Sequence, residues 1–86
     1  MFAGYNTNIS HNNKIYHIQT EDSGQDNPVI VTLLYFEGTI LASKKSAYND
    51  IMNKSDFEQK IRTIMKEQQE QMITELLTGK YSGENR

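Results

Sequence analysis

The sequence predicts an α+β fold, in which an antiparallel meander of three to four strands is followed by one long C-terminal helix packed on one face. Two patterns predict it. Up to about Tyr48, apolar residues largely follow the two-residue period of strands. From Phe57 onward they recur every three or four residues, as on one side of an α-helix. Each period buries an apolar face only in its own type of secondary structure, so the strands come first and the helix last.

The first two strands are expected to form a hairpin. Polar and apolar residues alternate over 5–9, and the pattern stops at 10–13, where two Asn residues tolerate the positive φ of a tight turn. A second strand is expected over 15–22. Its buried face is expected to carry Tyr16, Ile18 and Thr20.

The third strand, over 28–36, is apolar on both faces. One helix covers only one face of a small sheet, so the other face requires another subunit, a curled sheet or a partner. We expect a homodimer, because a chain of 86 residues without cysteine buries little surface alone. An Asp at Leu33 or Ile64 is expected to unfold the protein, since both residues belong to apolar faces.

The fourth strand is expected over 39–46, after a turn at Glu37 and Gly38. Lys44 and Lys45 lie near its end, as charges often do on an exposed sheet edge. The connector that follows is expected to hold a helical turn around 48–52.

A helix is expected over 56–78. Ser55 and Glu58 have the spacing of a capping box, and Gly79 suits a left-handed stop. We expect a single domain over 1–80 and a frayed C-terminal tail over 81–86. The apolar stripe of the helix contains Phe57, Ile61, Ile64, Met65, Met72 and Leu76, with Gln68 in its middle.

The C-terminal end of this helix is the expected dimer interface. At about 35 Å the helix is longer than an eight-residue strand of about 27 Å, so its last turns should overhang the sheet. Gln68 is expected either to bond a second Gln68 across a two-fold axis or to face water at the sheet margin. The expected interface residues are Gln68, Met72, Ile73, Leu76 and Leu77.

Two stretches resemble an uncharacterised family of small bacterial proteins. They are Tyr-His-Ile-Gln-Thr-Glu-Asp-Ser-Gly at 16–24 and Gly-Thr-Ile-Leu-Ala-Ser-Lys-Lys at 38–45, followed by Tyr48. The resemblance covers about residues 5 to 81 and implies no assigned activity. The order of four strands and one helix is also similar in outline to transcriptional coactivators whose dimers bind single-stranded DNA on a curved sheet.

No sequence pattern predicts catalysis. His17, Glu21, Asp22 and Asp26 cluster in the sequence, but their spacing matches no calcium loop. A polar strand face beside a turn is the interpretation we favour. We therefore expect no enzyme, no catalytic residue, no cofactor and no metal ion.

The predicted function is that of a non-catalytic protein-interaction or regulatory module, acting as a homodimer in the cytoplasm. No stretch has the pattern of a secretory signal or the run of about 20 apolar residues that spans a bilayer. The alternative is a single-stranded nucleic-acid binder. It ranks second because the formal net charge of -2 provides no overall positive field for phosphates. Its expected contacts are Lys14, Tyr16, Tyr35, Lys44 and Lys45.

Overall fold

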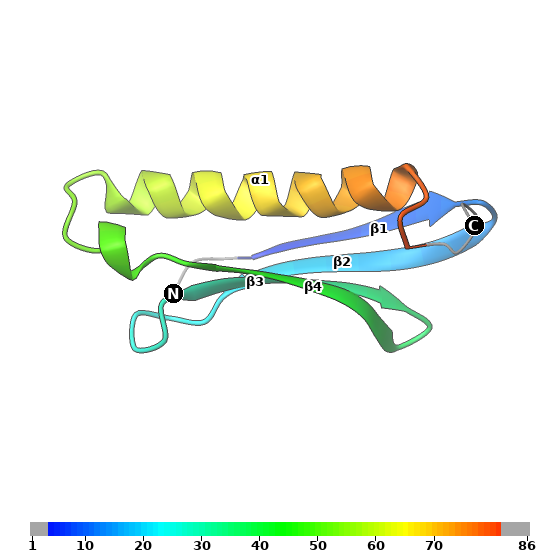
Figure 1. Ribbon diagram of the computed structural model, residues 1–86, viewed down its shortest axis with the longest axis horizontal. Helices are drawn as coiled ribbons and strands as arrows, with labels where there is room; N and C mark the ends of the chain where they lie inside the picture. Colours follow the sequence, from blue (N-terminus) through cyan, green and yellow to red (C-terminus); the bar gives the residue numbers. More distant parts are fainter. Residues whose placement is uncertain (1–3, 82–86) are drawn as a thin grey trace.

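The structure, a computed structural model, describes residues 4–81. Four strands form one antiparallel sheet in the order β1-β2-β3-β4, and a long helix lies along one of its faces (Figure 1). The predicted α+β meander is therefore confirmed. The elements are β1 (Tyr5–His11), β2 (Lys14–Asp22), β3 (Val29–Phe36), β4 (Thr39–Ala47), the short 3-10 helix η1 (Asn49–Ile51) and α1 (Phe57–Leu77).

Two of the three hairpins turn through two residues with positive φ. These are Asn12 and Asn13 between β1 and β2 (φ 53° and 65°), and Glu37 and Gly38 between β3 and β4 (φ 51° and 81°). Positive φ at both central positions is the signature of the turn that matches the natural twist of paired strands. The two predicted turns are thus confirmed.

A β-bulge interrupts the β3–β4 ladder. Tyr35 pairs with Ile40 and Leu34 pairs with Ala42, so Leu41 has no partner opposite it. Because side chains alternate between faces, this extra residue reverses which face every later residue of β4 occupies. Without it Lys44 would lie opposite Val31, whereas the observed partner of Val31 is Lys45.

The core lies between α1 and the sheet, in two apolar clusters. Tyr16 and Ile18 are buried in one of them, as predicted. Thr20, Thr32, Gln68 and Gln69 are also buried and belong to neither cluster. The first cluster contains Tyr16, Ile18, Leu34, Met72 and Leu76. The second contains Ile30, Tyr48, Ile61 and Met65.

The predicted capping box is wrong. The N-cap residue of α1 is Asp56, and no side chain caps the helix. Ser55 precedes the N-cap position by one residue. The chain enters the helix through turns, in which the Phe57 amide donates to the Lys54 carbonyl at 3.2 Å. The helix therefore begins on backbone hydrogen bonds, with Ser55 exposed.

The predicted C-terminal stop is confirmed. Gly79 has φ 89°, its amide donates to the Leu76 carbonyl at 3.0 Å, and the Lys80 amide donates to the Glu75 carbonyl at 3.1 Å. These two bonds form a Schellman motif, in which the left-handed residue lets the chain reverse over the last turn. Tyr81 then folds back and is half-buried, whereas the rest of the predicted tail, 82–86, lies outside the described residues.

The last turns of α1 do not overhang the sheet. Met72 and Leu76 are fully buried in a cluster with residues of β2 and β3. The 21-residue helix is about 32 Å long and the nine-residue β2 spans about 30 Å, so the two lengths match. The overhang prediction is wrong because it assumed a longer helix and shorter strands.

Leu33 and Ile64 are only half-buried. The fully buried neighbours are Leu34 and Ile61, both with 0% exposure. An unfolding substitution is therefore expected at Leu34 or Ile61, and not at Leu33 or Ile64.

Among the described residues, no helix is both long and apolar enough to cross a membrane.

Candidate interaction surface

The face of the sheet opposite α1, which we call the open face, carries an apolar stripe along β3. Its four β3 residues, Val29, Val31, Leu33 and Tyr35, are all half-buried. In the described residues no element packs over this face, as Figure 1 shows. Two further apolar side chains extend the stripe, Ile15 on β2 (68% exposed) and Ile40 on β4 (53% exposed).

Polar residues flank the stripe on both sides. On β2 the His17 ring lies 6.0 Å from the Tyr35 ring, and His17 Nδ1 lies 2.9 Å from Asn8 Oδ1 of β1. Farther along, Val31 lies between Glu21 on β2 and Lys45 on β4, its partners in the two ladders. The open face thus has an apolar centre, an acidic group on one side and a basic group on the other.

The covered face is held to α1 by a buried amide network. The Gln69 side chain accepts from Thr20 Oγ1 at 2.5 Å and donates to the Ile18 carbonyl at 3.1 Å. The Gln68 side chain donates to the Ile30 and Lys44 carbonyls and accepts from Ser46. No buried side-chain polar atom in the described residues lacks a partner. The network therefore sets the register of the helix on the sheet.

Gln68 follows neither of its two predicted roles. It is 6% exposed and its amide makes its hydrogen bonds within the chain. It therefore neither faces water nor needs a second Gln68 as a partner.

The burial of Gln69 was not predicted from the sequence. A signal existed, because Gln69 lies four residues after Met65 and three before Met72, and therefore shares their side of the helix.

A second polar cluster ties the end of α1 to the β4 edge. Glu75 accepts from Tyr81 Oη at 2.6 Å and lies 2.9 Å from Lys44 Nζ and 3.6 Å from Lys80 Nζ. The hydrogen bond from Tyr81 and that from Lys44 lower the pKa of the Glu75 carboxyl.

Tyr48 belongs to the other apolar cluster of the core. Its burial and its hydrogen bond to Asp22 raise the pKa of Tyr48 to about 12.

Acid is expected to remove the contribution of Glu75 to stability. Its folded pKa lies below the ordinary 4.5, so the contribution is complete above that pH and is lost as the pH falls through the folded value. Glu75→Gln should therefore destabilise the protein most near pH 7 and progressively less below pH 4.5. Urea unfolding over pH 3 to 7, read by circular dichroism, measures this.

Glu70→Gln is the control for that series, because Glu70 is an exposed residue of the same helix. It should change the free energy of unfolding little at any pH. A Glu75→Gln effect independent of pH would contradict the ionic role of the carboxylate.

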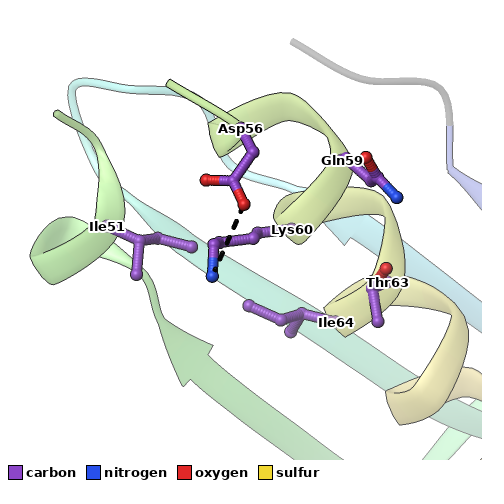
Figure 2. A pocket seen from close by; sticks show the side chains of 6 residues that line it. All are labelled: Ile51, Asp56, Gln59, Lys60, Thr63 and Ile64. Carbon is purple, nitrogen blue, oxygen red and sulfur yellow. Dashed lines mark ion pairs between the residues drawn. The ribbon is translucent and has the colours of Figure 1, made fainter. Parts of the chain in front are cut away.

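One pocket lies at the N-terminal end of α1. It has a volume of about 420 Å³ and is lined by one residue of η1, the N-cap residue of α1 and four residues near the start of the helix (Figure 2). The Lys60 ammonium and the Asp56 carboxylate in it are exposed and lie 3.7 Å apart, so each already has a counter-charge. An exposed, mutually paired acid and base offer no activated nucleophile. The lining residues are Ile51, Asp56, Gln59, Lys60, Thr63 and Ile64.

The structure does not bring the nucleic-acid residues together. Tyr16 is buried in the core, and Lys44 is held by Glu75 on the helix side. Tyr35 and Lys45 lie on the open face, on the opposite side of the sheet. Lys14 Nζ lies 5.9 Å from the centre of the Phe36 ring. Strand alternation separates Lys44 from Lys45, so these residues do not form one continuous surface.

The residues expected at a helix interface are mostly covered by their own sheet. Gln68, Met72 and Leu76 are buried within one chain, and Ile73 is half-buried against the same core. Leu77 alone of the five is exposed, at 49%. The apolar surface that α1 leaves accessible to another subunit is therefore smaller than that of the open face.

The sequence cluster of His17 and three carboxylates is also divided. His17 lies on the open face, whereas Asp22 is buried on the other side, where it accepts from Tyr48 Oη at 2.6 Å. Asp22 Oδ1 also accepts from the Gly24 amide. In the part of the chain that the structure describes, no three His, Cys, Asp or Glu side chains gather as a metal site would require.

Comparison of the chain with protein-family models, with curated proteins and with solved structures finds no match.

Proposed function

We propose that this protein is a non-catalytic interaction module that acts as a homodimer, and that two copies meet through the open face. The observation that supports this is the apolar stripe of β3, with Ile15 and Ile40 at its sides. A contiguous apolar patch rimmed by polar residues is typical of a surface that another protein covers. Leu77 on α1 offers a far smaller apolar contact.

The expected dimer is weak. From strand spacing and rise, the open face of β2, β3 and β4 measures roughly 14 by 27 Å, a flat footprint of roughly 400 Å² per copy. A standard interface buries about 800 Å² per partner. The dimer should therefore be weaker than one with a standard interface, and association should depend on concentration.

Sedimentation equilibrium from about 5 to about 500 µM tests the proposal by mass action. The wild type is expected to pass from monomer to dimer within this range. Leu33→Asp should remain a monomer throughout while keeping its fold, because it places a charge at the centre of the stripe without entering the core. Circular dichroism and the melting temperature check the fold of the variant.

Asn6→Asp is the matched control, since it adds the same charge to the open face of β1, outside the apolar stripe. It should dimerise as the wild type does. A wild type that is monomeric up to the highest concentration would refute the proposed function, whatever the variants do.

A further inference from the structure

We infer that the two copies meet with their β3 strands running in the same direction, so that Glu21 of each copy faces Lys45 of the other. The two-fold axis then lies between the two sheets and runs along β3. This inference rests on the proposed function, because it specifies the geometry of the open-face dimer.

The charges lie at equal positions on either side of β3. Glu21 and Lys45 are the two ladder partners of Val31, so all three side chains share one face and one level along the strands. Neighbouring strands are about 4.8 Å apart, which places the two charged residues symmetrically about β3. Both are exposed, and the ion pairs found within residues 4–81 involve neither of them.

A half-turn about an axis along β3 places β2 of one copy over β4 of the other. Each residue keeps its position along the strand direction. The half-turn therefore sets the Glu21 carboxylate of one copy over the Lys45 ammonium of the other, twice in the dimer. The next level follows the same rule, because Gln19 and Ser43 are the two partners of Leu33. Acid meets base at the level of Val31 and polar meets polar at the level of Leu33, whereas at the level of Tyr35 the His17 ring of one copy lies over Ile40 of the other.

The same axis is consistent with the polar residues on the open face of β1. Because the sheet order is β1-β2-β3-β4, the rotation leaves β1 of each copy outside the overlap. The open face of β1 carries Asn6, Asn8 and Ser10, which are exposed and suited to water. An axis across the strands would place β1 over β1 and bury these polar groups, and it would pair neither Glu21 nor Lys45 with the other.

Charge reversal tests this geometry. Glu21→Lys alone places lysine against Lys45 at both contacts, and Lys45→Glu alone places glutamate against Glu21. Each single variant is expected to raise the dimer dissociation constant at least about tenfold at low salt. An equimolar mixture of the two variants should form a heterodimer with opposite charges at both contacts, and the double variant Glu21→Lys/Lys45→Glu should regain the homodimer.

The controls reverse the same charges on exposed positions of α1. Glu70→Lys and Lys66→Glu change the net charge equally but lie on the other side of the molecule, so they should leave dimerisation unchanged. Sedimentation at low ionic strength and native mass spectrometry distinguish the homodimers from the heterodimer.

Two failures are distinguishable. If the single variants dimerise like the wild type, or their mixture gives no heterodimer, while Leu33→Asp is monomeric, then the parallel arrangement is overturned and the open-face dimer stands. If the wild type never dimerises, both the arrangement and the proposed function are overturned.

Discussion

Leu34→Asp is expected to abolish the folded state, whereas Leu33→Asp leaves it intact. Leu34 is 0% exposed in the apolar cluster under α1, and no basic group belongs to that cluster. A buried carboxylate without a partner costs several kcal/mol, against a total stability of about 5 to 10 kcal/mol for a domain of this size. Far-ultraviolet circular dichroism and urea titration at pH 7 measure the difference.

The adjacent substitution is the control because strand alternation turns Leu33 toward the open face. Its expected cost is about 1 kcal/mol, through β-propensity and the loss of packing with neighbouring strands. A folded Leu34→Asp, or equal losses at both positions, would show that the assignment of the two sheet faces is incorrect.

Gln69→Ala is expected to lower the stability by about 2 to 4 kcal/mol, a fall in melting temperature of roughly 10 to 25 °C. Removing the amide leaves a cavity and deprives the Ile18 carbonyl and the Thr20 hydroxyl of their helix partner. Buried polar groups that lose a partner cost more than the bond contributes when it is made. Thermal unfolding followed by circular dichroism measures the shift.

Two variants isolate the cause. Gln71→Ala alters an exposed glutamine of the same helix and should leave the melting temperature nearly unchanged. Gln69→Leu keeps most of the volume but not the hydrogen bonds, and should still lose about 1 to 3 kcal/mol. A Gln69→Leu protein as stable as the wild type would mean that the network contributes specificity of packing but little stability.

The amide network also shows what sequence periodicity cannot predict, namely the hydrogen-bond partners of a buried polar residue. The stripe that contains Ile61, Met65, Met72 and Leu76 follows from the helical period, and all four are buried as expected. Periodicity places Gln69 on the same side, yet it gives no partner for it. The partners Thr7, Thr20 and the Ile18 carbonyl are 49 to 62 residues away in the sequence.

The candidate site was predictable in kind but not in position. The doubly apolar pattern of 28–36 indicates that a single helix leaves one side of the sheet uncovered, and the structure shows that side as the open face. Grouping Lys44 with Lys45 was the error. Neighbours on a strand point to opposite faces, and Lys44 lies with Glu75 of α1.

Periodicity, paired turn residues and a well-placed glycine act over a few residues, so they predicted that strands precede one helix, where two tight turns lie and where the helix stops. Which lysine lies on the open face, and opposite which residue, depends on the folded structure. The bulge at Leu41 sets that register, and nothing local in the sequence specifies it. Cross-strand and helix-sheet contacts join residues that are distant in the sequence, so the chemistry of these contacts depends on a register that the whole fold establishes.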